Sequence, residues 1–415
     1  MKKRMLAFGA IVAAGALALT GCSGSVSSGQ SSAGGATSLD WAIWGNTPPE
    51  IASAEHIAGL VHASDPNLTV KVQTMSWPDY WTKLPTTLAG GNPPCLVSMQ
   101  MGHVREFADS LLPLDNLLAS ASINVSDFDP GIMKALQVDG KQLAIPYDLG
   151  PIVLYYNKDM FKAAGVAEPQ NGWTIDEFVA DAKKLTSGSN YGFTMDNSIE
   201  PLMDWAPSIT GSLPVTDDGK LAINTPEMVS VMSWYAGLVN KEKVAAPVIA
   251  SPTSTASVAF LGGTAAMYAN GPWEMINNKA QAKFNMGIVT VPAGPKGVTG
   301  PIEGSGFGIS KKCGNPTAAI KAIAVLTGTD ALAYMGDIGR AFPARTAQQG
   351  SWYKNAVDGS KATLEAAMKN GVPYRATTHW TEDGLNYTQG VVSVINGNSS
   401  AADFLKGVQD QSQSK

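Results

Sequence analysis

Segments with the two-residue period of a β-strand alternate along this chain with segments that have the period of an α-helix. Residues 39–44 and 68–73 have the strand pattern, and residues 51–63 between them have the helix pattern. A later apolar run at residues 152–156 also fits a buried strand. Alternation of this kind is typical of an α/β fold with largely parallel sheets, because a helix usually connects one parallel strand to the next.

Capping residues mark where several of the helices are expected to begin. Thr174 stands three residues before Glu177, which predicts a capping box that satisfies the first backbone N–H groups of a helix. Ser76 is the expected cap of another helix that runs to about residue 89. Pro85 lies inside that helix, so the sequence predicts either a kink or an early end there.

The first residues of the chain have the layout of an export signal. Residues 1–4 are basic apart from the initial methionine, and residues 5–19 are all apolar or glycine. This apolar run is too short for a comfortable membrane span. Residues 19–22 read Leu-Thr-Gly-Cys, which resembles the lipobox of bacterial lipoproteins. Residues 1–21 are therefore expected to be a signal peptide and Cys22 a lipidated residue. The alternatives are an ordinary secretory signal with a chance cysteine and an uncleaved anchor.

Residues 22–38 follow as the lipidated cysteine and a flexible tether. Residues 23–38 are almost entirely serine, glycine, alanine and threonine, a composition that buries no core. The remaining chain, about 375 residues, is longer than one hydrophobic core usually supports, which predicts two domains. A tether behind a lipidated cysteine would hold these domains at the outer face of a bacterial cell membrane.

Composition and charge exclude some classes of partner. The chain has 44% hydrophobic and 15% charged residues, as soluble globular proteins do. Its formal net charge is −5 and no basic block occurs, so no nucleic-acid partner is expected. The four histidines show no metal-ligand spacing, and neither a metal nor a cofactor is expected.

Cys95 and Cys313 are the cysteines that remain once Cys22 is set aside. Export permits a disulfide between them, and two free thiols are equally compatible with the sequence alone.

Motifs of common enzyme classes do not occur in the sequence. There is no G-x-S-x-G elbow, no phosphate-binding loop, no H-E-x-x-H and no G-x-G-x-x-G. The chain is therefore not expected to be an enzyme. A secreted glycan hydrolase stays open as an alternative, because its two catalytic carboxylates meet only in space.

Aromatic residues fall at the ends of expected strands or in turns. In open α/β sheets ligands bind beyond the carboxyl ends of strands, and aromatic faces there suit sugar rings. Packing in the core is the alternative for each tryptophan, and it is favoured for Trp41 and Trp234. The aromatic residues at strand ends or in turns are Trp44, Tyr147, Trp205, Trp273 and Trp380.

The order and spacing of several short motifs together resemble one protein family. The chain resembles the extracellular solute-binding proteins of ABC sugar importers, the group that contains maltose-binding protein. Cys95 and Pro85 depart from the family pattern. The matching motifs are residues 80–84, 88–94, 112–114, 139–147, 154–159, 169–178, 266–268, 271–273 (Gly-Pro-Trp), 306–310 and 342–345 (Phe-Pro-Ala-Arg).

The resemblance implies two α/β lobes with a ligand cleft between them and hinge crossings near residues 147–150. The N-lobe would hold residues 39–146 and 300–333. The C-lobe would hold residues 147–299 and 334–415. The resemblance also implies that a strand at residues 306–310 runs antiparallel beside the Cys95 strand, which would bring Cys313 toward Cys95 for a disulfide.

The resemblance also points to ligand-binding residues. Trp273 is implied as a stacking platform, and Asp148 and Arg345 as groups that bind hydroxyls. An ion pair that bridges the lobes is the alternative for Arg345, a helix cap for Glu200, and simple exposure for His103. Trp380 is proposed from its local setting in a Thr-His-Trp-Thr segment taken as a loop. The full set is Trp44, Asn46, Gln100, Met101, His103, Asp148, Glu200, Asp204, Trp205, Trp273, Gly306, Arg345 and Trp380.

The function implied is capture of a carbohydrate, with an oligosaccharide favoured, by closure of the lobes. The closed protein, expected to be a monomer, would deliver the ligand to the membrane permease of an ABC importer. A lipoprotein of the same fold that acts as a sensor or adhesin is a further alternative.

Overall fold

The computed structural model describes residues 36–249, 255–297, 300–369 and 371–414. The expected signal peptide, Cys22 and most of the expected tether lie outside these residues. The first strand begins at Thr37, so the last residues assigned to the tether belong to the folded chain.

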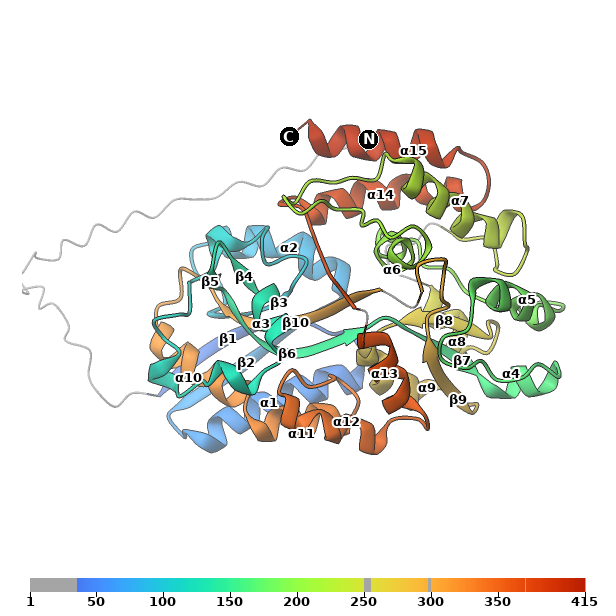
Figure 1. The fold of residues 1–415 in the computed structure, drawn as a ribbon. Coiled ribbons are helices and arrows are strands. Elements are labelled where there is room, and N and C mark those ends of the chain that lie inside the picture. Colours follow the sequence, from blue (N-terminus) through green and yellow to red (C-terminus); the bar gives the residue numbers. More distant parts are fainter. Residues whose placement is uncertain (1–35, 250–254, 298–299, 370, 415) are drawn as a thin grey trace, which may run out of the picture. The chain divides into compact units, whose positions relative to one another are not determined.

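A six-stranded sheet collects strands from distant parts of the chain (Figure 1). The parallel strands β1 and β2 pair from Thr37 with Leu68 to Trp44 with Met75, and β3 lies parallel on the other side of β1. Strand β10 is antiparallel to both β3 and β6, and β11 pairs in parallel with the first two residues of β10. The strands are β1 (Thr37–Trp44), β2 (Leu68–Met75), β3 (Leu96–Gln100), β6 (Ala144–Pro151), β10 (Pro301–Ile309) and β11 (Val372–Pro373).

A second sheet of three strands is wholly antiparallel. Strand β7 (Val153–Asn157) lies between β8 (Met267–Asn270) and β9 (Met286–Thr290) and is antiparallel to both. The expectation of largely parallel sheets is therefore wrong for this sheet. Helix α9 (Met275–Gln281) does link two strands that point the same way, but β7 is inserted between them. Strand order is a long-range property, which the alternation of periods does not encode.

The helices form separate groups that pack on different strands or on one another. Helix α1 packs on β2, and α10 packs on α1, β2 and β10. Helix α13 packs on β6, β7 and β9, whereas α7, α14 and α15 pack together (Figure 1). The other elements are the short strands β4 (Gln137–Val138) and β5 (Lys141–Gln142). The helices are α1 (Pro48–Ser64), α2 (Trp77–Ala89), α3 (Pro130–Ala135), α4 (Lys158–Ala163), α5 (Ile175–Leu185), α6 (Glu200–Ile209), α7 (Pro226–Asn240), α8 (Ala256–Leu261), α10 (Pro316–Leu326), α11 (Thr329–Asp337), α12 (Gln349–Asn355), α13 (Ser360–Lys369), α14 (Trp380–Ile395) and α15 (Ala401–Gln413).

Local sequence fixes where helices begin. Thr174 and Glu177 form the predicted capping box at the start of α5, and the Ser76 hydroxyl accepts from the backbone N–H of Asp79 at the start of α2. Helix α2 continues through Pro85 to Ala89, so it does not end early.

Two chain segments lie at the expected lobe boundaries. Strand β6 runs without a break from Ala144 to Pro151, so the expected crossing lies inside a strand that pairs with β10. Helix α11 contacts α1 and α10, and the ring of Tyr334 stacks on His56 with centroids 3.8 Å apart. The segment that packs beside the six-stranded sheet therefore continues past residue 333.

Large aromatic side chains, including Trp41 and Trp234, pack in the core. Trp41 is fully buried, its indole N–H donates to the Ser98 hydroxyl at 3.1 Å, and its ring meets Phe307 edge-on. Trp234 packs on Trp205 with ring centroids 5.0 Å apart. Both tryptophans favoured as packing residues are therefore packed, Trp41 completely and Trp234 in part.

Within the described part of the chain, no single helix is long and apolar enough to cross a membrane. Helices α10 and α11 meet those criteria only as a pair with a 47° bend between them.

A disulfide joins Cys95 to Cys313, the pairing that the family resemblance implied. The two cysteines are 218 residues apart in sequence. Cys95 directly precedes β3 and Cys313 follows β10, and these strands are antiparallel neighbours. Their pairing explains how the two thiols meet. Closing so long a loop restricts the unfolded chain strongly.

Replacing both Cys95 and Cys313 by serine is expected to lower the free energy of unfolding by about 5 kcal/mol, because the unfolded chain regains the entropy of the open loop. Guanidinium titration of the oxidised protein and the double variant measures the difference. Reductant should destabilise the wild-type protein and leave the variant unchanged. Equal stability of all these forms would contradict the prediction.

Candidate ligand site

An aromatic face lies at the carboxyl ends of β1 and β2. Trp44 ends β1, and its ring meets Trp77 and Trp81 of α2 with centroids 5.0 and 5.5 Å away. Trp77 is 42% exposed and Trp44 is half-buried. Because β1 and β2 are parallel, their ends bring these indoles to one edge of the sheet.

His103 packs against this aromatic face and contacts both Trp81 and Glu106. Its ring stacks on Trp81 with centroids 3.6 Å apart, and its Nδ1 lies 3.1 Å from Oε2 of Glu106. Burial lowers the pKa of His103, and Glu106 offsets part of that effect. The Thr381 hydroxyl of α14 donates to the same Glu106 oxygen at 2.8 Å. His103 is thus buried and partnered rather than exposed.

Asp148 of β6 belongs to a balanced group of buried charges. Its carboxylate accepts from the backbone N–H of Ser305 on β10 at 2.6 Å. Burial raises the pKa of Asp148 to about 7, and the charge of Arg340 limits the rise. Burial likewise raises the pKa of Glu274 to about 7. The positive charge of Arg340 therefore limits the rise in pKa of two acids, Asp148 in the six-stranded sheet and Glu274 in the turn that follows β8 of the three-stranded sheet.

A hydrogen bond connects the starts of α1 and α9. The Thr47 hydroxyl, which caps α1, lies 2.9 Å from the side-chain oxygen of Asn277. Asn277 also donates to Glu274 at 3.3 Å. Residues 230 positions apart thus meet at the edge of the Arg340 charge group.

Two buried acids and one half-buried acid form what we call the acid triad: Asp204 of α6 and Glu303 of β10 are buried, and Glu200 of α6 is half-buried. Glu200 and Asp204 are one helical turn apart and share a face of α6. The side-chain amide of Gln100, at the end of β3, donates to Glu303 at 3.3 Å. The Tyr374 hydroxyl donates to Glu200 at 2.8 Å.

The acid triad is strongly perturbed by burial. Burial raises the pKa of Glu200 to about 7 and raises the pKa values of Asp204 and Glu303 well above their usual range. Mutual repulsion among the three carboxyl groups adds to the rise. One oxygen of Asp204, Oδ1, is buried without a hydrogen-bond partner.

Tyr374 reaches the acid triad beside a small cavity. The cavity measures about 100 Å³ and is lined by Met101, Arg105, Asp217, Tyr374 and Arg375, among others. Gly102 makes this approach possible, since a Cβ there would lie 2.6 Å from a ring carbon of Tyr374. The cavity therefore leads from the surface toward the hydroxyl that contacts Glu200.

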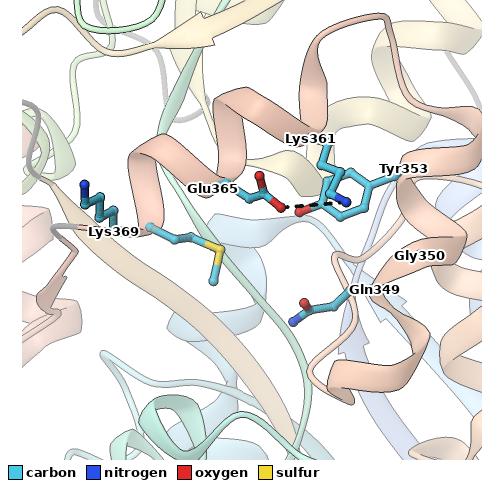
Figure 2. A pocket seen from close by; sticks show the side chains of 7 residues that line it. Gln349, Gly350, Tyr353, Lys361, Glu365 and Lys369 are labelled. Carbon is cyan, nitrogen blue, oxygen red and sulfur yellow. Dashed lines mark ion pairs between the residues drawn. The ribbon is translucent and has the colours of Figure 1, made fainter.

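A separate cavity of about 540 Å³ lies between α12 and α13. Figure 2 shows its lining, including the ion pair of Lys361 and Glu365 at 3.9 Å. The charged side chains that line it are exposed, and none was predicted as a site residue. It has none of the buried polar character of the acid triad.

Comparison with known proteins decides the family. Residues 62–362 match the family described as bacterial extracellular solute-binding protein. The chain belongs to this family. It is 24% identical over 254 residues to a putative binding protein of Brucella abortus, covering 59% of this chain and 61% of that relative. It is 25% identical over 291 residues to an uncharacterized lipoprotein of Streptomyces antibioticus, covering 66% of this chain and 63% of that protein.

A solved structure supports the two-lobe solute-binding fold. An ABC substrate-binding protein of Listeria monocytogenes in complex with cycloalternan superimposes with a TM-score of 0.84. The match covers 91% of this chain and 98% of that protein at 22% identity. The expected α/β solute-binding fold is confirmed, and the recognition of the family with it.

The structure brings together many of the predicted site residues of this solute-binding protein. Gln100, Glu200 and Asp204 meet at the acid triad, and Met101 lines the adjoining cavity. Trp273, in a short helical turn at Pro272–Glu274, is half-buried against Gly271, where a Cβ would lie 2.2 Å from its ring.

Four other predicted site residues are either buried by packing or exposed to solvent. Trp205 is 1% exposed and packs among Phe178, Phe193 and Trp234, so it lies in the core rather than facing a ligand. Trp380 is buried as the first residue of α14, not in a loop. Gly306 is buried inside β10, and Asn46 is exposed beside Glu50.

Sequence reasoning missed Glu303, Tyr374, Arg340 and Trp77. Glu303 carried a usable signal, since it is an acid inside an otherwise apolar or small-residue strand. Arg340 and Tyr374 carried none, because their partners lie far away in sequence.

Arg345 makes structural contacts with its whole side chain. Its Nη1 donates to Asp127 at 2.7 Å, its Nε donates to the Thr327 carbonyl, and its guanidinium lies 4.5 Å from the Phe128 ring centroid. This is the ion-pair alternative rather than the hydroxyl-binding role. The contacts fix the Phe-Pro-Ala-Arg segment beside the six-stranded sheet.

Arg345→Met is expected to destabilise the folded chain by about 1–2 kcal/mol, because the Thr327 carbonyl and Asp127 lose their donor. Urea titration measures the loss. Ligand affinity should stay within about twofold, as should that of the exposed control Lys321→Met on α10, since a lost charged contact to ligand would cost far more. A tenfold loss of affinity with unchanged stability would reverse the assignment.

Proposed function

We propose that this protein is the substrate-binding component of an ABC importer and that its ligand is a carbohydrate. The observation that carries the proposal is a cluster of buried polar side chains beside an exposed and a half-buried indole, at the carboxyl ends of the parallel strands. Sugars present hydroxyls that need partners and ring faces that stack on aromatic rings. The fold shared with a protein seen in complex with cycloalternan supports this choice.

The ligand would lie between two lobes. One lobe holds residues 39–146 and 300–333 with most of the six-stranded sheet, and we extend its return segment through α12. The other holds residues 147–299 and the C-terminal helices. Trp44, Trp77 and Trp273 are the candidates for stacking, whereas Gln100, Asp148 and the acid triad are the candidates for binding hydroxyls.

Hinge motion would occur where the chain passes between the lobes. Strands β6 and β10 are the paired crossings, and their register shifts between Ser305 and Gly306. The contacts of Thr47 with Asn277 and of Glu106 with Thr381 would join the lobes when closed. Ligand that touches both lobes shifts the population toward this closed form.

Delivery to a permease needs no chemistry from this protein. The closed form would dock on the membrane subunits, whose ATPase supplies the work. We propose that it acts as a monomer and binds an oligosaccharide, since the aromatic face offers more than one stacking surface.

Lipid anchoring completes the proposal. The Leu-Thr-Gly-Cys motif ends a short apolar segment, and a relative is named as a lipoprotein. We propose that Cys22 is acylated and holds the binding domain at the outer face of the cell membrane.

A thermal-shift screen over mono- and oligosaccharides tests the proposed ligand class. At least one carbohydrate should raise the melting temperature, because binding to the folded state alone stabilises it. Trp273→Ala should abolish this shift and leave the unliganded melting temperature nearly unchanged. Trp205→Ala is the matched control, and it should lower stability by about 3–5 kcal/mol as a core truncation.

No stabilisation of the folded wild-type protein by any saccharide would count against a carbohydrate ligand. Consumption of a bound saccharide during the screen would favour a glycan hydrolase instead.

Cys22→Ala is expected to move the full chain from the membrane fraction to the soluble extracytoplasmic fraction, because the acylated residue is removed. Cell fractionation and labelling with a fatty-acid analogue measure the change. Cys95→Ser serves as the control and should keep the label. Membrane retention of the Cys22 variant would show that the apolar segment remains as an anchor.

A further inference from the structure

Two groups of charged side chains lie on or beside β10. Only the first group contains a positive charge. In the first, Arg340 offsets Asp148 and Glu274. The second is the acid triad, whose carboxyl groups are near enough to repel one another. No described lysine or arginine forms an ion pair with any member of the triad.

Hydrogen bonds satisfy the triad only in part. Gln100 donates to Glu303, and Tyr374 donates to Glu200. Asp204 is 8% exposed, and its Oδ1 is buried without a donor. A buried acceptor of this kind is costly unless something donates to it. The site therefore favours a ligand that brings a donor to Asp204.

The chemistry of that donor follows from the charge. A neutral hydroxyl offers one hydrogen bond and leaves the repulsion among the acids in place. A protonated amine offers up to three donors and a positive charge. The described residues contain no group of three or more His, Cys, Asp or Glu arranged to hold a metal ion. An ammonium group is the better match.

We propose that the acid triad recognises a protonated amino group on the bound ligand, which makes that ligand an amine-bearing saccharide. The proposal rests on the proposed capture of a carbohydrate and specifies its class. The aromatic face would hold a sugar ring, whereas Glu200, Asp204 and Glu303 would surround the amine.

Protons compete with the amine for the triad. The titratable groups that face it are Asp196, Asp148, Tyr235 and Tyr374, and none of these is cationic. Burial raises all three pKa values, so the triad holds protons in acidic solution. Amine binding must release them. Affinity is therefore expected to rise with pH as the carboxyl groups lose their protons, until the amine loses its own proton.

Calorimetric titration with three matched disaccharides tests the proposal on the native protein. Cellobiose, diacetylchitobiose and chitobiose differ at carbon 2, which carries a hydroxyl, an acetamide or an amine. Chitobiose should bind about 10- to 100-fold more tightly at pH 7 than the other two, as one charged hydrogen-bonded contact permits. Its binding enthalpy should change with the ionisation enthalpy of the buffer, which reports proton release. Spermidine supplies amines without a sugar ring.

Asp204→Asn and Glu303→Gln test the residues. Each should weaken chitobiose binding by about 10- to 100-fold and cellobiose binding by no more than about threefold. The exposed control Glu55→Gln should change neither. At pH 8 both triad variants should raise the melting temperature of the unliganded protein by about 2 °C, because repulsion is relieved. A purely structural role predicts a lower melting temperature instead.

The outcomes separate this proposal from the carbohydrate function. Equal affinity for the three disaccharides, or equal losses for chitobiose and cellobiose in the variants, overturns amine recognition and leaves saccharide capture standing. Binding of spermidine alone supports amine recognition and overturns saccharide capture. Binding of none of these compounds overturns amine recognition, and the wider saccharide screen then decides whether the ligand is a carbohydrate.

Discussion

The ladder between β6 and β10 is the interaction on which the arrangement of this chain depends. Strand β10 arrives about 150 residues after β6, lies antiparallel between it and β3, and makes β6 part of the six-stranded sheet. That pairing connects β3, through β10, to β6, which leads directly into the three-stranded sheet. The same ladder brings Ser305 to Asp148 and carries Glu303 toward Gln100. Fold and candidate site therefore share one set of backbone hydrogen bonds.

The site concentrates groups that a folded protein would otherwise avoid burying. Arg340 compensates the acids around Asp148 and Glu274, whereas the acid triad relies on two neutral donors. Buried polar groups that are only partly satisfied reduce stability. Their presence between well-packed layers is understandable if the function of the chain is to bind, since a ligand can supply what the protein lacks.

Local pattern predicted much of the fold, and the limits of that prediction have physical causes. The capping residues of α2 and α5 and the first strands follow from local sequence, and the structure confirms them. The position of β7 between β8 and β9 did not follow, because neighbours in a sheet are chosen by packing over long distances. In the candidate site, Gln100 and Asp204 were predicted from the sequence, but Arg340 and Tyr374 were not. Trp205 and Trp380 were misread, because sequence does not reveal what covers an indole.

The disulfide beside β3 also changes what a break in the chain would mean. Cys95 and Cys313 enclose the whole three-stranded sheet, α6 and both strands that pass between the sheets. A single proteolytic cut anywhere inside that loop would leave the two fragments covalently linked. For a protein exposed outside the cell, one nick in a surface loop therefore separates the sequence without releasing a piece of the molecule.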